Sequence, residues 1–174
     1  MVVQSSLVIR DRSFEWGKRT YIMGVLNVTP DSFSDGGEFD RPSAALEQAQ
    51  RLVAAGADII DIGGQSTRPG AIEVSVAEEL ERVLSVVQLL RPAISVPISV
   101  DTTRAAVARA AIASGADIVN DISGGVFDPE MLATVAKLGV PIVLMHMRGT
   151  PQTMQQLTDY EDLIGEIYQF LESR

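Results

Sequence analysis

The 174-residue sequence contains no cysteine. This absence excludes disulfide bonds, zinc–thiolate sites and thiol nucleophiles, and it fits a reducing compartment such as the cytoplasm. There is a single histidine, His146, so a metal site built from several histidines is excluded as well. Any bound ion is therefore expected to be a hard cation on oxygen ligands, with Mg²⁺ as the first candidate.

Positive charge and long apolar runs are also scarce. The 14 Lys and Arg residues stand against 23 Asp and Glu residues, which gives a formal net charge of -9. Such a charge repels nucleic acids and anionic membrane surfaces, so we expect neither as a partner. No apolar segment approaches the roughly 18 residues of a membrane span, and the N-terminus lacks the apolar core of a signal peptide. These features predict a soluble cytoplasmic protein, with enough apolar sequence for one sizeable core.

Two segments of the chain nearly repeat each other. They read AAGADIIDIGG at 54–64 and ASGADIVNDISGG at 113–125. Each follows a stretch with apolar residues at helical spacing, and Gly56 and Gly115 stand where a left-handed residue would end those helices. The repeating unit is therefore predicted to be a helix, a glycine cap, a strand and a glycine-rich loop.

From Tyr21 onward the pattern predicts the order βαβαβαβαβα. Five short, almost continuously apolar strands that alternate with helices favour a parallel sheet covered by helices. The expected helix faces contain Ala45, Ala49, Leu52 and Val53; Val76, Leu80, Val83, Leu84 and Val87; Val107, Ala110 and Ala111; Met131, Leu132, Val135 and Ala136; and Leu163, Ile164, Ile167, Phe170 and Leu171. Ahead of them, residues 7–21 predict a hairpin with its turn near Gly17.

Two architectures use this order, the open doubly wound sheet and the closed (β/α)8 barrel. No G-x-G-x-x-G follows the first strand, which weakens the dinucleotide-binding version of the open sheet. Polar residues lie at or just beyond the end of every strand, as is usual for the barrel: Asn27, Asp61, Asp101, Asn120 with Asp121, and His146. We therefore predict an α/β fold, a parallel (β/α)8 barrel of which this chain holds the first five βα units. It would be one domain over residues 1–174, with the hairpin in 1–20 and the units in 21–174.

Two polar loops are candidates for a functional site. NVTPDSFSDGG begins at Asn27 and continues for about a dozen residues before the next helix, and loops of this length are usually functional or disordered. Phe33 in its middle is an aromatic residue that a solvated loop does not need. GGQSTRPGA at 63–71 offers the hydroxyl of Thr67, the guanidinium fork of Arg68 for a carboxylate or phosphate, and Pro69 to stiffen the exit. An exposed Arg68 in a plain connector fits equally well.

Single residues at other strand ends have competing interpretations. Asp101 in SVDTTR could cap the following helix, but Thr102 and Thr103 can also cap it, which leaves Asp101 to accept from a ligand N–H. The donor and acceptor of Asn120 match the edge of an amide-like heterocycle. His146 lies between two methionines, which is more typical of a packed histidine than of a catalytic one.

Five segments together resemble the dihydropteroate synthase family of folate biosynthesis, whose members bind pterins. They are IMGVLNVTPDSFSDGG, GADIIDIGGQSTRPGA, SVDTTR, GADIVNDISGG and PIVLMHMRGTPQTMQ, in the family's order from about residue 21 to 156. The resemblance implies a transferase that joins 4-aminobenzoate to the methylene carbon of dihydropterin diphosphate and releases pyrophosphate. It also implies a homodimer for the full-length enzyme. Folate-dependent methyltransferase domains are the alternative among enzymes, but they do not look like NVTPDSFSDGG or STRPGA.

The resemblance also implies roles for individual residues. Asn27 would help to hold the Mg²⁺–diphosphate. The pterin slot would be lined by Asp101, Asn120, Ile122 and Met145. Thr67 and Arg68 would approach the diphosphate and the reacting carbon as the catalytic pair, and Phe33 and Pro69 would shape the aminobenzoate pocket.

The family pattern continues with an aspartate, a lysine, an arginine and a histidine at the ends of strands six to eight, whereas this sequence ends at Arg174. We therefore expect the 174-residue chain alone to be inactive and poorly stable, because an open barrel leaves unpaired strand edges and exposed core surface. From a different class, the alternative is a truncated or non-catalytic pterin-binding or assembly module.

Overall fold

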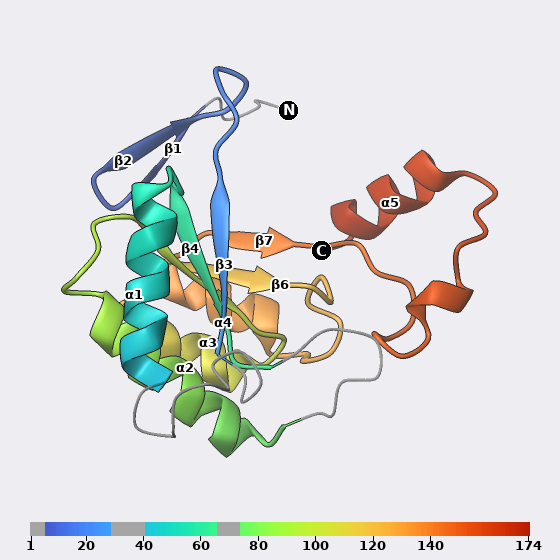
Figure 1. The fold of residues 1–174 in the computed structure, drawn as a ribbon. Coiled ribbons are helices and arrows are strands. Elements are labelled where there is room, and N and C mark those ends of the chain that lie inside the picture. Colours follow the sequence, from blue (N-terminus) through green and yellow to red (C-terminus); the bar gives the residue numbers. More distant parts are fainter. Residues whose placement is uncertain (1–5, 29–40, 66–73) are drawn as a thin grey trace.

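A computed structural model describes residues 6–28, 41–65 and 74–174 (Figure 1). A two-stranded sheet contains β1 (Ser6–Ile9) and β2 (Arg12–Glu15), and a five-stranded sheet contains β3 (Met23–Asn27), β4 (Ile59–Gly63), β5 (Ile98–Asp101), β6 (Ile118–Asp121) and β7 (Ile142–Leu144). The helices are α1 (Arg41–Ala54), α2 (Val76–Leu90), α3 (Ala105–Ala113), α4 (Met131–Leu138) and α5 (Leu163–Glu172), with a short 3-10 turn at Met154–Gln156. The predicted alternation of strands and helices is confirmed.

The larger sheet is parallel throughout, with its strands in chain order from β3 to β7. Helices α1 to α4 lie side by side along it, and α5 lies apart from them, beyond the C-terminal ends of β6 and β7 (Figure 1). Parallel neighbours in chain order need a crossover after each strand, and the helices provide it. The sheet therefore has one face covered by helices and one face that these helices leave open.

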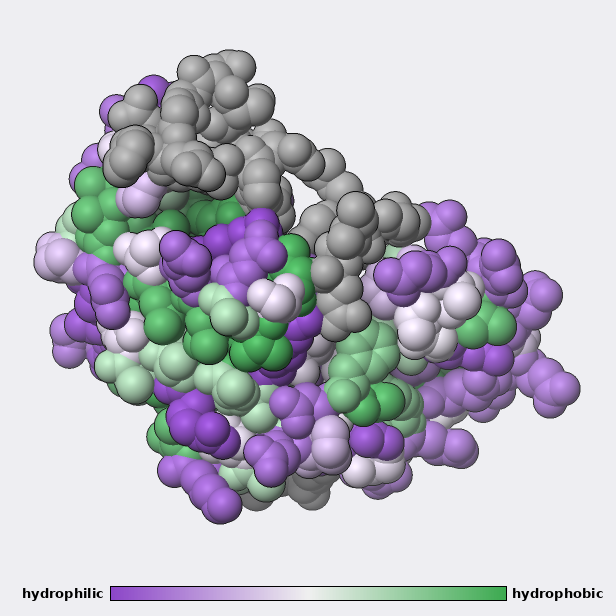
Figure 2. All heavy atoms as spheres, turned by 90° about the horizontal axis from the view of Figure 1, so that it is seen from below, coloured by the Kyte–Doolittle hydropathy of each residue, from purple (hydrophilic) through white to green (hydrophobic). Residues whose placement is uncertain are grey.

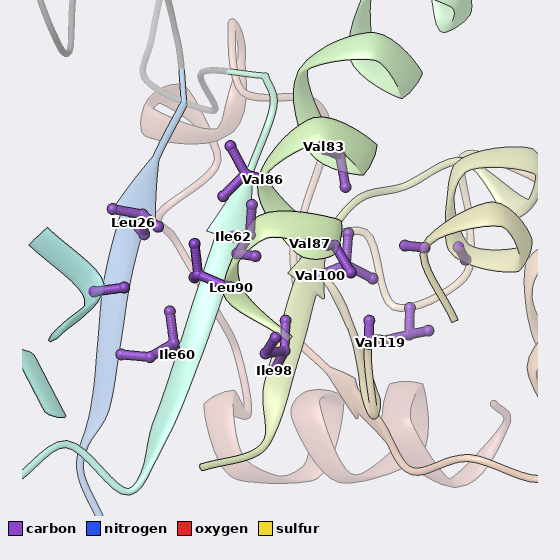
Figure 3. Close-up of a cluster of buried hydrophobic side chains, with 14 of the residues drawn as sticks. Leu26, Ile60, Ile62, Val83, Val86, Val87, Leu90, Ile98, Val100 and Val119 are labelled. Atoms are coloured by element: carbon purple, nitrogen blue, oxygen red, sulfur yellow. The ribbon is translucent and has the colours of Figure 1, made fainter. Parts of the chain in front are cut away.

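The main core lies between the sheet and the helices. Figure 3 shows the side chains of Leu26, Ile60, Ile62, Ile98, Val100 and Val119 facing Val83, Val86, Val87 and Leu90 of α2. All ten are at most 3% exposed. Full burial of one such side chain is worth about 1.5–3 kcal/mol, so this layer dominates the stability of the described fold.

The N-terminal hairpin packs against the start of the open sheet face. Ile9 and Phe14 form a second buried cluster with Ile59 and Ile118, whose side chains point away from the helices. The hairpin is confirmed, but the turn between its strands was misplaced. Ile9 pairs with Arg12, so Arg10 and Asp11 form a two-residue turn in which Arg10 has a φ of 55°, and the turn at Gly17 follows β2. Such turns need a positive φ, which glycine, asparagine and aspartate usually provide, and arginine gave no such signal.

The two copies of the Gly-Ala-Asp repeat form the same structure at the starts of two strands. Gly56 and Gly115 have φ values of 105° and 111°, as expected for residues that end a helix. Asp58 Oδ2 accepts a hydrogen bond of 2.9 Å from the backbone N–H of Ile22, and Asp117 Oδ2 accepts one of 2.8 Å from that of Ile98. The aspartate of each copy is thus hydrogen-bonded to the start of a neighbouring strand.

An arginine completes each of these attachments. Arg19 binds both carboxylate oxygens of Asp58, at 2.6 and 2.9 Å, and Arg91 donates to Asp117 Oδ2 at 2.9 Å. The hydrogen bonds from Arg19, and that from the Ile22 backbone, hold the pKa of Asp58 below its usual value.

Among the described helices, none is long and apolar enough to cross a membrane.

The Asp58 attachment predicts a pH-dependent stability difference. Asp58→Asn should lower the free energy of unfolding by about 1 kcal/mol at pH 7, because the variant loses a charge-assisted pair whose arginine is half exposed. The lowered pKa stabilises the folded state above the unfolded-state value of about 3.9, so the deficit should shrink as the pH falls below about 4. Urea unfolding between pH 3 and 7 measures this difference. Glu47→Gln, in an exposed pair with Arg51, is the control and should change little; an Asp58→Asn deficit independent of pH would contradict the account.

Candidate functional site

The strand register places three of the polar strand-end residues and one glycine in one row. Asn27 pairs with Gly63, Gly63 with Asp101, and Asp101 with Asn120. Side chains alternate along a strand, and the neighbours of these residues, Leu26, Ile62, Val100 and Val119, point toward the helices. Asn27, Asp101 and Asn120 therefore point to the open face at the C-terminal edge of the sheet, where parallel α/β proteins bind ligands.

Gly63 leaves a gap in this row. A Cβ atom at Gly63 would lie 3.6 Å from Asn27 Oδ1 and 3.6 Å from Asp101 Oδ2. The φ of Gly63 is not in the left-handed region, so backbone strain does not require glycine here. Its lack of a side chain keeps open the space between an amide oxygen and a carboxylate oxygen, which a ligand could enter.

Asn120 is held by a residue one row deeper in the sheet. Its Nδ2 donates a 3.0 Å hydrogen bond to Asp61 Oδ2. This bond fixes the orientation of the amide, so Asn120 Oδ1 remains an acceptor on the open face. Asp61 is 4% exposed, and burial raises its pKa. Ser99 lies beside it in the sheet, and the Ser99 hydroxyl and the Asn120 amide partly offset the effect of burial on the pKa of Asp61.

Asp101 has the most strongly shifted carboxyl group at this edge. Burial, followed by the negative charges of Asp61, Glu79 and Asp121, raises its pKa to about 7. Near neutral pH Asp101 can therefore both accept and donate a hydrogen bond. A buried carboxyl with a perturbed pKa at a strand end is typical of a functional site.

Asp101 does not cap the following helix. The sequence interpretation likewise favoured a role for Asp101 other than capping. Thr102 Oγ1 accepts from the backbone N–H of Arg104 at 3.2 Å, and Asp128 Oδ2 accepts from that of Ala105 at 2.8 Å. The first turn of α3 thus has partners other than Asp101. Asp121, next to Asn120, points the other way and binds the backbone N–H groups of Ser123 and Gly125 within its own loop.

The other predicted site residues divide into two groups. Ile122 follows β6 directly, and Met145 follows β7 with its N–H donating to the Asp121 carbonyl, so both lie near the C-terminal edge beside Asn120. Met145 is 39% exposed. Phe33, Thr67, Arg68 and Pro69 lie outside the described residues, and their roles stay predictions.

Sequence reasoning gave no role to Asp61 or Glu79. The signal for Asp61 is a carboxylate inside an apolar strand, IIDIGG, where a solvated loop cannot explain it. Glu79 gave no signal, because a glutamate in the first turn of a helix is ordinary. His146 packs against Phe170, with ring centroids 5.0 Å apart, and beside Tyr160, as its methionine neighbours suggested.

The oxygen atoms at this edge suit an ion that takes most of its ligands from a bound phosphate and water. No group of three or more His, Asp or Glu residues in the described ranges could hold a metal ion by itself. Asn27 Oδ1 and Asp101 Oδ2 border the same gap at Gly63. Mg²⁺ commonly uses one or two protein oxygens and completes its coordination with water and phosphate, so a phosphate-bound Mg²⁺ fits beside Asn27.

The raised pKa of Asp101 predicts that this residue destabilises the fold at alkaline pH. The folded-state pKa is about 7 and the unfolded-state pKa is about 3.9. The protonated carboxyl therefore contributes to the free energy of unfolding below about pH 4, and this contribution is lost as the pH rises to about 7. Asp101→Asn should therefore unfold at higher urea concentration than the unmodified protein at pH 8, and the gain should shrink toward pH 5. Asp11→Asn, in the exposed hairpin turn, is the control. A gain that is equal at pH 5 and pH 8 would contradict the shift.

Figure 2 views the molecule from below and shows hydrophobic residues among hydrophilic ones on that side.

Comparison with known proteins shows which proteins the chain resembles. The family model described as pterin binding enzyme matches residues 23–174. A dihydropteroate synthase of Synechocystis is 63% identical over 161 residues, and the alignment covers 92% of this chain and 56% of the relative. The Escherichia coli K12 dihydropteroate synthase is 48% identical over 150 residues, with 86% and 53% covered.

Solved structures agree with the sequence comparison. Yersinia pestis dihydropteroate synthase in a sulfonamide complex superposes with a TM-score of 0.85 at 46% identity, covering 97% of this chain and 60% of that one. The Xanthomonas albilineans enzyme with 4-aminobenzoic acid gives 0.84 at 43% identity, with 97% and 59% covered. The parallel sheet with its helices thus matches the barrel of these enzymes, and the chain spans a little over half of their length. On the family match and the identities together, the chain belongs to the pterin binding enzyme family.

Proposed function

We propose that this protein acts in dihydropteroate synthesis, as a transferase that joins 4-aminobenzoate to the methylene carbon of dihydropterin diphosphate. The observation that carries the proposal is the row of Asn27, Asp101 and Asn120 around the gap at Gly63. These side chains combine hydrogen-bonding groups for a heterocycle with an amide oxygen suited to an ion bound to phosphate.

The heterocycle would bind at Asp101 and Asn120. A pterin presents an amino group and ring N–H groups along one edge, and these need acceptors in fixed positions. Asn120 Oδ1 is oriented by the bond from Nδ2 to Asp61, and Asp101 offers carboxylate oxygens from the neighbouring strand. Paired acceptors of this kind favour a ligand with adjacent donors over one that lacks them, because a buried acceptor without a partner costs free energy. Ile122 and Met145 would pack against the ring faces.

The diphosphate would lie toward Asn27, across the gap from Asp101. Mg²⁺ on the diphosphate would neutralise charge on the leaving group, and Asn27 Oδ1 would be its protein ligand. With a net charge of -9, the protein gives an anion little general attraction, so local donors must hold it. The resemblance assigns this task to Thr67 and Arg68.

The reaction has a simple balance. The amine nitrogen of 4-aminobenzoate forms a bond to the methylene carbon, the carbon–oxygen bond to the diphosphate breaks, and the amine loses a proton. Asp101 and Asn120 orient the ring that carries this carbon, and orientation of two substrates can supply a large part of the rate enhancement. Phe33 and Pro69 would shape the pocket of the incoming amine.

The relatives support the chemistry of these substrates. The Xanthomonas albilineans enzyme was solved with 4-aminobenzoic acid, and a Clostridium difficile dihydropteroate synthase, 43% identical to this chain, was solved in the presence of pteroic acid. A homodimer and a Mg²⁺ requirement remain part of the proposal.

Gly63→Ala tests the proposed site without disturbing the fold. Its Cβ would meet Asn27 and Asp101 at 3.6 Å, an ordinary contact distance, so the unfolding midpoint should stay close to that of the unmodified protein. The methyl group would still occupy the gap, and formation of dihydropteroate from the two substrates should fall by about 10- to 100-fold. Enzyme assays and thermal unfolding of the complete gene product measure both.

The neighbouring Gly64→Ala is the matched contrast. Its Cβ would lie 2.8 Å from Val83 Cγ2, so this variant should lose stability, because the crowding is on the helix side. Full activity of folded Gly63→Ala would contradict the proposed site. Pterin binding without product formation by the unmodified protein would favour the non-catalytic pterin-binding module instead.

A further inference from the structure

Glu79 is a buried carboxylate on α2, outside the row of site residues. It is 2% exposed, its Oε1 accepts a 2.6 Å hydrogen bond from Thr102 Oγ1, and its Oε2 accepts one of 2.6 Å from Arg104 Nη1. Helix α2 packs on the far side of the sheet from the open face. The Glu79–Arg104 pair nevertheless reaches the loops that carry the site.

One of these loops begins at the end of β5. Thr102 follows Asp101 directly, and its backbone N–H donates to the Asn120 carbonyl at 3.0 Å. The hydroxyl of the same residue is bound by Glu79, so Thr102 connects α2 to the two positions proposed to bind the pterin. A shift of Glu79 would therefore move Asp101 relative to Asn120.

The other loop begins at the end of β4. Gly64 packs against Glu79 so closely that a Cβ there would lie 3.2 Å from Glu79 Cγ and 3.3 Å from its carbonyl oxygen. Arg82, on the same helix, donates to the Gly64 carbonyl at 3.0 Å. Arg104 Nη2 donates to the Val74 carbonyl at 2.7 Å. The exits of both strands are thus fixed to one helix.

We propose that Glu79 and Arg104 are positioning residues that set how Gly63, Asp101 and Asn120 lie relative to one another across the row. This inference rests on the proposed function, because the row matters only if it binds the substrate. Stability alone is a weak reason for a buried ion pair, since apolar residues of similar size are often as stabilising. Geometry is a stronger reason, because a displacement of about 1 Å at a site can cost on the order of 100-fold in rate.

The experiment compares Glu79→Gln, Arg104→Met and the double variant in the complete gene product. Arg104→Met alone leaves a buried carboxylate without its main charge partner and should lower the melting temperature strongly. The double variant removes both charges, so much of that loss should be recovered. Arg109→Met is the matched control, because Arg109 on α3 donates to Thr134 of α4, away from the strand exits.

The measurements are the Kd for pterin alone, kcat and KM for both substrates, and exchange of the Thr102 amide hydrogen. For the double variant we expect recovered stability, a pterin Kd weakened by about tenfold, a lower kcat and faster exchange at Thr102, with Arg109→Met unchanged. A double variant that binds pterin and turns over like the unmodified protein would overturn the inference, because the pair would then be structural only.

Failure of the proposed function has a different signature. If the unmodified protein neither binds pterin nor forms dihydropteroate, the proposed function is wrong. The amide exchange of Thr102 then still decides whether the pair positions the loop: faster exchange in the double variant supports positioning, and unchanged exchange contradicts it.

Discussion

The parallel register of strands β3 to β6 is the constraint on which the site depends. Because side chains alternate along each strand, the pairing of Asn27 with Gly63, Gly63 with Asp101 and Asp101 with Asn120 places their polar groups on one face and in one row. A slip of one residue in any strand would turn that strand's polar group into the apolar core. The same layer of apolar side chains that stabilises the sheet therefore also fixes where the polar groups lie.

This arrangement concentrates negative charge at the edge that we propose for an anionic substrate. Asp101 and Asp61 are both held in surroundings that raise their pKa values. Such groups reduce stability, and functional sites often carry this cost. The raised pKa of Asp101 also reduces the repulsion that a diphosphate would meet, since the group is partly neutral near pH 7.

Much of the fold could be predicted from the sequence, because its signals are local. Helical spacing, the glycines that end helices and the apolar strands predicted the order of elements, and Gly56 and Gly115 have the expected positive φ. The hairpin turn was misplaced, because a two-residue turn at Arg10 has no glycine to mark it. Asp61 and Glu79 received no role, because their importance comes from partners 59 and 23 residues away in the chain.

Selective ¹⁵N labelling of asparagine tests the central claim most directly. In the complete gene product, the pairs of side-chain amide signals of Asn27 and Asn120 are assigned by their loss in Asn27→Ser and Asn120→Ser variants. Pterin alone should shift the Asn120 pair and leave the Asn27 pair nearly unchanged, whereas pyrophosphate with Mg²⁺ should shift the Asn27 pair. Binding of both ligands without a shift of either pair would contradict a site built on this row.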